Sequence, residues 1–180
     1  MRPLTDDETK AVFEKLTKYM GQDVARLLDR KDERHVFRLQ KQRVYYLSES
    51  QLKSASNVSR DNLVALGTLF GKFTKSGKFH LTIHCLDFVA QYAKYKVWVK
   101  ANSEMSFLYG HHVTKTGLGK ITEGTPQYAG VVVYSLSSVP LGFGLAAQST
   151  STMANLEPTA IAVLHQADIG EYLRAEQEMN

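Results

Sequence analysis

Basic and aromatic side chains are interleaved between residues 26 and 46. Tyr45 and Tyr46 follow directly after a run of seven basic residues, namely Arg26, Arg30, Lys31, Arg34, Arg38, Lys41 and Arg43. Cations that neutralise phosphates, next to rings that stack on bases, are typical of a path for single-stranded RNA. The alternative is an ordinary solvated surface, in which Asp29, Asp32 and Glu33 form ion pairs with the basic residues.

A second group of cations surrounds one predicted turn. Lys72, Lys75 and Lys78 lie around residues 74–77, where the composition favours a hairpin. Three ammonium groups at one tip could bind phosphate, although lysines there also serve to keep a sheet edge soluble. We expect these three lysines to contact RNA, together with Arg34, Arg38, Lys41 and Arg43 from the first group.

Motifs for catalysis and metal binding are weak. The segment 117–120 reads Gly-Leu-Gly-Lys, but Ile121 replaces the Ser or Thr that a phosphate-binding loop needs. In a strand over residues 79–85, His80 and His84 face away from Cys85, which argues against a shared zinc site. We therefore expect no enzymatic activity, no metal and no cofactor.

The elements that must position these cations are predicted from local patterns. Thr5 and Glu8 form a capping box that opens a helix. The further expectations for the first half are the end of this helix near residue 20, strands over 36–40 and 43–47, a second capping box at 48–51, a buried strand over 63–73 and a returning strand over 79–85. The last of these strands places Cys85 in its apolar phase and predicts a buried, inert thiol.

The second half reads as a series of short strands with one helix. The predicted elements are a strand over 95–99, a helix that begins near 102 and ends at Gly110, and strands over 129–134, 140–146 and 159–165. Strands of this length, broken by Gly and Pro, predict a small closed or nearly closed sheet.

This order of elements resembles the PUA domain, a pseudo-barrel shared by RNA-modifying enzymes and RNA-binding factors. The spacing of Gly110, Val113 and Gly117 after the short helix carries the resemblance, as do the paired apolar strands 129–134 and 140–146. Together with its first ninety or so residues, the whole chain resembles the animal members of the Nip-seven family, which are assembly factors of the large ribosomal subunit.

The resemblance implies an α+β fold. An N-terminal α/β domain over residues 1–94, with a mainly antiparallel sheet, would precede a PUA-type barrel over residues 95–180. It further implies a non-catalytic role in pre-rRNA processing and 60S subunit biogenesis. The implied partners are pre-rRNA or other single-stranded RNA and the assembly proteins of the pre-60S particle, in the nucleus and nucleolus and also the cytoplasm.

The resemblance also carries an RNA-binding role to the groove beside the short helix, the glycine turn and the last strand. The candidate residues there are Lys96, Lys100, His111, Lys115 and Lys120. The last strand has no Lys or Arg, and its residues Ala160, Ile161 and Ala162 suit a protein partner instead. The alternative function is therefore a protein-interaction adaptor in pre-ribosomes with little direct RNA binding.

Charge is distributed unevenly along the chain of 180 residues. Residues 1–94 hold 17 Lys and Arg against 11 Asp and Glu, whereas residues 95–180 hold 5 against 7. The first half should therefore supply most of the attraction for phosphate. The single cysteine is consistent with a reducing compartment. From the composition of the first residues and the lack of long apolar runs we expect neither a signal sequence nor a membrane segment. We expect a monomer outside its complexes.

Overall fold

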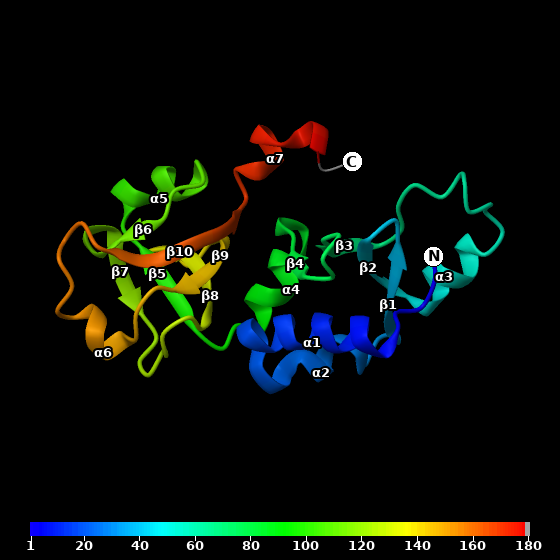
Figure 1. Cartoon of the computed structure of the whole chain (residues 1–180), viewed down its shortest axis with the longest axis horizontal. Coiled ribbons are helices and arrows are strands. Elements are labelled where there is room, and N and C mark those ends of the chain that lie inside the picture. Colours follow the sequence, from blue (N-terminus) through cyan, green and yellow to red (C-terminus); the bar gives the residue numbers. More distant parts are fainter. Residues whose placement is uncertain (179–180) are drawn as a thin grey trace. The chain divides into compact units, whose positions relative to one another are not determined.

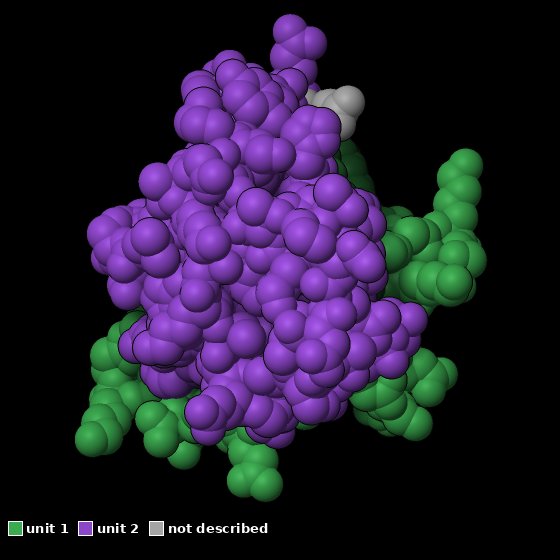
Figure 2. All heavy atoms as spheres, turned by 90° about the vertical axis from the view of Figure 1, so that its left-hand side faces the viewer, with its two compact units in different colours: residues 1–88 green, residues 89–180 purple. Residues whose placement is uncertain are grey.

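The computed structural model describes residues 1–178. The chain divides into two compact units, Met1–Phe88 and Val89–Asn180 (Figures 1 and 2). The division falls within helix α4 (Leu86–Gln91). The domain boundary expected from the sequence lies a few residues later, between residues 94 and 95. That boundary stays a prediction.

The first helix of unit 1 begins and ends where its local sequence requires. The helix α1 (Asp6–Met20) opens on the expected capping box, because the Glu8 amide donates to Thr5 Oγ1 and the Thr5 amide donates to a Glu8 carboxylate oxygen at 2.9 Å. Gly21 ends it with φ of 60°, a backbone conformation that favours glycine. The short helices η1 (Gly21–Val24) and α2 (Ala25–Leu28) follow.

Unit 1 is built on a four-stranded antiparallel sheet, sheet A, with the strands in chain order. These are β1 (His35–Gln40), β2 (Arg43–Ser48), β3 (Thr68–Phe73) and β4 (Phe79–Leu81). The predicted strand over 63–73 is wrong in its first part, because Gly67, at φ of 73°, turns the chain and pairing begins only at Thr68. The second capping box is confirmed, since Ser48 and Gln51 open helix α3 (Glu49–Ala55).

Aromatic rings fill one face of sheet A beneath α1. Phe13 of α1 meets Phe37 edge to face at 6.0 Å, and Phe37 in turn contacts Tyr46 and Phe70 at 5.3 Å each. Helices α1 and α2 lie along this side of the sheet in Figure 1. The helices α1 and α2 therefore cover the aromatic rings on this face.

The last part of unit 1 corrects one prediction and confirms another. The strand expected over 79–85 ends at Leu81, and residues Ile83–Cys85 form the 3₁₀ helix η2. Cys85 is nevertheless fully buried, as expected, and burial raises the pKa of its thiol. The thiol is protonated and shielded from reagents.

Unit 2 contains a six-stranded sheet, sheet B, in the order β6-β10-β9-β8-β5-β7. Its elements are β5 (Lys96–Val99), α5 (Ala101–Leu108), β6 (Val113–Thr114), η3 (Lys115–Gly117), β7 (Leu118–Ile121), β8 (Gly130–Ser135), β9 (Pro140–Ala146), α6 (Thr150–Met153), β10 (Ile161–Asp168), α7 (Glu171–Arg174) and η4 (Glu176–Glu178). The edge strands β6 and β7 are joined directly by η3, so the sheet curls into a nearly closed barrel.

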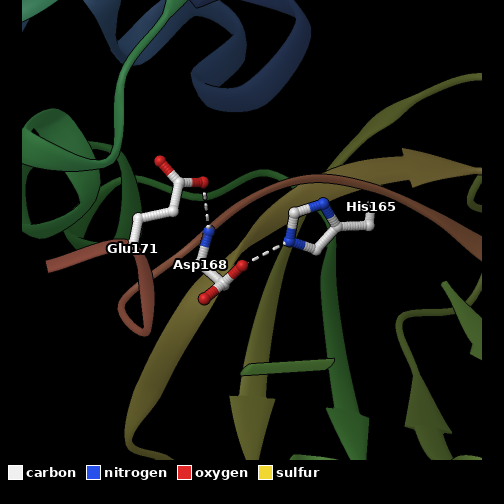
Figure 3. Close-up of side chains that lie close together, drawn as sticks. All are labelled: His165, Asp168 and Glu171. Atoms are coloured by element: carbon white, nitrogen blue, oxygen red, sulfur yellow. Dashed lines mark hydrogen bonds and ion pairs between the residues drawn. The ribbon is translucent and has the colours of Figure 1, made fainter. Parts of the chain in front are cut away.

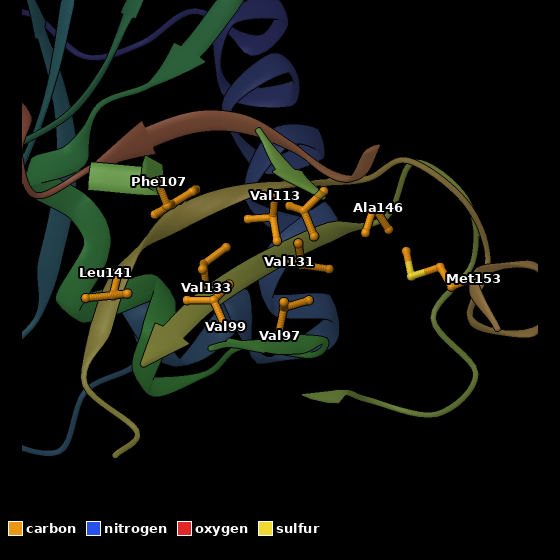
Figure 4. Close-up of a cluster of buried hydrophobic side chains, with 11 residues drawn as sticks. Val97, Val99, Phe107, Val113, Val131, Val133, Leu141, Ala146 and Met153 are labelled. Atoms are coloured by element: carbon orange, nitrogen blue, oxygen red, sulfur yellow. The ribbon is translucent and has the colours of Figure 1, made fainter. Parts of the chain in front are cut away.

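The barrel interior is apolar. Val97 and Val99 of β5, Val131 and Val133 of β8, and Phe107 of α5 are all at most 1% exposed and pack together (Figure 4). The predicted helix and strands are thus confirmed in kind. The last strand is displaced, because it runs over Ile161–Asp168 rather than 159–165.

Candidate nucleic-acid interface

A row of cationic side chains crosses one face of sheet A. Residues directly opposite each other in neighbouring strands point to the same face. Arg43 of β2 lies opposite Lys72 of β3, and Lys72 lies opposite His80 of β4. Arg38 of β1 lies opposite Tyr45, two residues along β2 from Arg43, so it shares that face as well. We call Arg38, Arg43, Lys72 and His80 the basic face.

Two turns add further cations at one end of this face. The β1–β2 turn carries Lys41 at φ of 48°, and the β3–β4 turn brings Lys75 and Lys78. The two turns lie at the same end of sheet A, since the Phe73 amide donates to the Gln42 carbonyl at 2.8 Å. Six of the seven predicted cations of unit 1 therefore gather in one region, although they are far apart in the sequence.

The electrostatics of the basic face favour an anion. Arg43 and Lys72 lie directly opposite each other in the sheet, an arrangement in which like charges repel. The field of these groups is felt nearby, because burial, Lys72 and Arg43 together lower the pKa of His84. A bound phosphate would relieve this repulsion.

The seventh cation, Arg34, is placed differently. It precedes β1, at the other end of the strand from Lys41, and forms an ion pair with Glu49 at 3.5 Å. Arg26 and Arg30 similarly pair with Asp23 and Asp32. Ion pairs of the kind that the solvated-surface interpretation predicts are therefore present at these residues, and the role of Arg34 in RNA binding stays a prediction.

The two tyrosines of the basic run cannot stack on bases as the sequence pattern suggested. Tyr45 is 3% exposed and Tyr46 is 2% exposed. Tyr46 packs among the aromatic rings beneath α1, and its hydroxyl donates to the Leu27 carbonyl at 2.5 Å. Tyr45 lies in a small apolar cluster with Leu47 and Leu69. Both rings are part of the core.

Of the predicted cations of unit 2, Lys96 and Lys120 lie beside the stacked rings of Trp98 and Tyr134, whereas Lys100, His111 and Lys115 come from other segments. The ammonium group of Lys120 lies 4.9 Å from the Trp98 ring centroid, and that of Lys96 lies 5.8 Å from the Tyr134 ring centroid, on the outer side of β5. Lys100 caps the start of α5, and His111 is exposed beyond its end. Lys115 turns inward and donates to the Met153 carbonyl, so it holds the α6 segment instead of facing solvent.

The apolar start of β10 offers less surface than expected. Ala162 is fully buried in the barrel core, and Ala160 is partly buried. Ile161 is 39% exposed and is the residue of the three that can meet a partner. The protein-interaction prediction is thus corrected for Ala162, because alternate residues of a strand face opposite sides.

A buried carboxylate beside α5 was missed in the sequence. Asp168 is fully buried at the end of β10 and accepts from His165 Nε2 at 2.6 Å (Figure 3). It also accepts from Arg174 at 2.8 and 3.1 Å. A β-bulge between His165 and Ala167 allows residues three apart to face the same side. Arg174 also donates to the Leu108 carbonyl, so the network ties α7 to the end of α5.

Glu171 lies next to this network and, together with His165 and Asp168, resembles a set of metal ligands. Ligand atoms of His165, Asp168 and Glu171 lie within 4.8 Å of one another. However, the Arg174 guanidinium already occupies both oxygens of Asp168, and the Asp168 amide donates to Glu171. The arginine supplies the positive charge that a metal would bring, so the donor set does not fit a metal ion.

Comparison with known families covers both units. Residues 1–83 match the model of the "NIP7/UPF0113, pre-PUA domain", and residues 95–177 match that of the "UPF0113 PUA domain". A Xenopus tropicalis protein named as a 60S ribosome subunit biogenesis protein NIP7 homolog is 61% identical over 179 residues, which are 99% of each chain. A Schizosaccharomyces pombe protein, 60S ribosome subunit biogenesis protein nip7, is 58% identical over the same share.

Solved structures support the same fold. A PUA-domain protein of Aeropyrum pernix K1 superposes with a TM-score of 0.62 at 17% identity, covering 96% of this chain and 87% of that chain. A conserved PUA domain protein of Thermoplasma acidophilum gives 0.57 at 16% identity and covers 97% of both chains. Among the described residues, no helix is both long enough and apolar enough to cross a bilayer.

Proposed function

Because the chain belongs to the NIP7 family, we propose that it acts in biogenesis of the 60S ribosomal subunit as a non-catalytic factor that binds pre-rRNA. Its curated relatives in frog and yeast are named for that process. The proposal includes action in the nucleus and nucleolus, with single-stranded segments of pre-rRNA and assembly proteins of the pre-60S particle as partners.

The observation that carries the proposal is the convergence of cations at one end of sheet A. Arg43 and Lys72 face each other across two strands, with Lys41, Lys75 and Lys78 at the adjoining turns. Each cation that meets a phosphate releases bound counterions, which is the main driving force for binding nucleic acid. Contacts of this type hold the RNA backbone without reading its sequence.

The role proposed for unit 2 is the recognition of shape. The PUA barrel presents His111 beyond α5, while Lys100 lies at the start of that helix. Nearby, the Asp168–Arg174 network fixes the end of α5 against β10. A rigid surface with few cations suits contacts to sugars and bases better than long-range attraction of phosphate.

The test compares two triple charge removals in the full chain. Arg38→Gln, Lys72→Gln and Lys75→Gln together remove charge from the basic face and its turn, whereas Lys96→Gln, Lys100→Gln and Lys120→Gln remove the same charge from unit 2. The affinity for a fluorescent single-stranded RNA oligomer is measured from low to high salt. We expect the first variant to bind more weakly, with a logarithmic salt slope smaller by about 0.7 for each phosphate that is no longer neutralised.

The same measurement distinguishes the proposed RNA-binding function from the alternative, a protein-interaction adaptor. If RNA binding is unmeasurable even at low salt, the chain is a protein-interaction adaptor, for which the exposed Leu136, Val139 and Ile161 of unit 2 offer apolar contacts. If the unit 2 variant loses more affinity than the basic-face variant, RNA is held by the barrel and the assignment to sheet A is wrong. A variant with Lys10→Gln and Arg34→Gln, which removes ion-paired charges, is the control.

A further inference from the structure

A pair of aromatic rings lies on the outer side of sheet B, away from the barrel interior. Val97 and Val99 of β5 point into the core, so Trp98 between them points out. Trp98 lies directly opposite Tyr134 of β8, and the two rings stack with their centroids 5.8 Å apart. On the other side of β5, Trp98 lies opposite Lys120 of β7, whose ammonium group is 4.9 Å from the ring centroid. Tyr134 and Lys120 therefore flank the indole from opposite sides.

The turn between β8 and β9 lies beside this aromatic pair and is held by hydrogen bonds. The Ser138 amide donates to the Ser135 carbonyl at 2.9 Å. Trp98 Nε1 donates to Ser138 Oγ at 3.2 Å, which ties the turn to β5. A Cβ atom added to Gly119 of β7 would lie 3.0 Å from Leu136 Cδ2, so the Leu136 side chain rests on this glycine. The turn is thus fixed to both neighbouring strands.

Two large apolar side chains of this fixed turn face solvent. Leu136 is 58% exposed, and Val139, which follows the serine bonded to the indole, is 51% exposed. Apolar groups that gather on a surface beside an aromatic ring are typical of contacts with another protein. Because the turn is already ordered, a partner that covers it loses little conformational entropy. We call Lys96, Trp98, Lys120, Leu136 and Val139 the turn patch.

The charge of the turn patch is positive. The ammonium groups of Lys96 and Lys120 lie over the two rings, while β5, β7 and the β8–β9 turn contain no Asp or Glu. The nearest acids along the chain are Glu104 in α5 and Glu123 after β7. Neither lysine forms an ion pair with them or with any other residue that the structure describes. The patch therefore complements carboxylates.

The exposed groups suit a peptide better than a nucleotide. Bases of single-stranded RNA bind by stacking on open aromatic faces. In the turn patch the indole is flanked by Tyr134 and Lys120, and the indole N–H already donates to Ser138. The most exposed apolar groups, Leu136 and Val139, are aliphatic and offer no ring for stacking. Aliphatic contacts with flanking cations fit an apolar side chain that has acids beside it.

We propose that the turn patch docks a segment of a partner protein in which a large apolar side chain is flanked by Asp or Glu. The apolar side chain packs on Leu136 and Val139 at the edge of the indole, and the carboxylates pair with Lys96 and Lys120. The inference rests on the proposed function in one respect, since that function includes proteins as partners. The surface itself is separate from the basic face.

The test selects ligands from a displayed library of random short peptides. The full chain is the target, and peptides that also bind a Leu136→Ser variant are removed. The enriched peptides are synthesised and titrated into the native chain. Because Trp98 is the only tryptophan, its indole N–H gives a single signal in nitrogen NMR spectra, and that signal reports contact at the turn patch.

We expect the enriched peptides to combine a large apolar residue with flanking acids and to shift the Trp98 signal in a saturable manner. Val139→Ser, and separately Lys96→Gln combined with Lys120→Gln, should each weaken binding about fivefold. Added salt should reduce the effect of the lysine variant. Met105→Ser is the matched control, because Met105 on α5 is also 58% exposed, and it should leave peptide binding unchanged.

Three results would overturn the proposal. These are a library that yields no enriched peptide, enriched peptides that lack acids or leave the Trp98 signal in place, and full binding by the lysine variant. If the single-stranded RNA oligomer shifts the Trp98 signal and displaces the peptide, the turn patch belongs to RNA instead. The proposed function is judged separately, because it fails only if that oligomer does not bind the native chain.

Discussion

At the scale of single residues, the buried carboxylate of Asp168 is the most demanding group in unit 2. A buried charge is tolerated only where it is fully paired, and here His165 donates to Oδ2 while Arg174 donates to both carboxylate oxygens. Asp168→Asn should therefore destabilise unit 2 by about 1.5–3 kcal/mol, the usual worth of hydrogen bonds to a charged group. Urea unfolding followed by the fluorescence of Trp98, the only tryptophan, measures this.

The neighbouring Glu171 should behave in the opposite way. Burial raises its pKa, so the folded state binds a proton more readily than the unfolded state. Below about pH 4 the carboxyl group is protonated in both the folded and the unfolded state, so it does not lower stability. The loss of stability is largest once the pH exceeds the pKa of Glu171 in the folded state. We expect Glu171→Gln to raise the melting temperature at pH 7 and to leave it unchanged near pH 4. An equal effect at both pH values would contradict the role of ionisation.

Cys85 has no chemical role in the proposed function. Its thiol is fully buried, and burial raises its pKa. Cys85→Ala should cost about 1–2 kcal/mol of stability through poorer packing and should leave RNA affinity unchanged. Rapid modification of the native thiol by a bulky reagent, or weaker RNA binding by a well-folded variant, would show that the group is accessible or functional.

At the scale of elements, the pairing of β3 with β4 depends on the absence of a side chain at Gly71. A Cβ atom there would lie 2.3 Å from the His80 carbonyl oxygen and 2.4 Å from the Phe79 ring. Gly71→Ala should separate the two strands, displace Lys72 from His80 and weaken RNA binding along with stability. Gly77→Ala is the matched control, because at φ of 78° it meets backbone strain but no neighbouring atom within 4 Å.

Circular dichroism during unfolding measures the stability of both glycine variants, and titration with RNA measures their affinity. Gly77→Ala should lose about 1 kcal/mol of stability and keep its RNA affinity, since the basic face is untouched. If Gly71→Ala binds RNA as tightly as the native chain, the arrangement of cations across β3 and β4 is not what holds the RNA.

At the scale of the whole molecule, charge and stacking surface are separated. Unit 1 carries the gathered cations, whereas its tyrosines are buried. We expect the full chain to prefer a uridine-rich single strand over a duplex of equal length, because a flexible strand can follow the basic face more closely than a stiff duplex can. Fluorescence anisotropy at fixed salt measures the preference. Equal affinity for the single strand and the duplex would mean that the attraction of phosphate alone accounts for binding.

The sequence by itself determined the local elements and the charge balance. The two capping boxes, the hairpin over residues 36–47 and the strands β5, β8 and β9 follow from interactions between residues close in the chain, whereas the short strands β6 and β7 were not predicted. The excess of cations in the first half is a property of composition. The burial of Cys85 was expected as well, although the strand that was to explain it ends at Leu81.

Only the tertiary structure decided which cations act together. Arg38, Arg43 and Lys72 meet because strand register sets residues from three strands side by side, and register depends on the whole sheet. The burial of Tyr45, which alternation alone cannot reveal, depends on Met1, Leu52 and Leu66, which pack around it on one part of that face. The Asp168 network needed a bulge and the return of α7 to the end of α5. Contacts between distant segments form only when the chain folds, so no local pattern contains them.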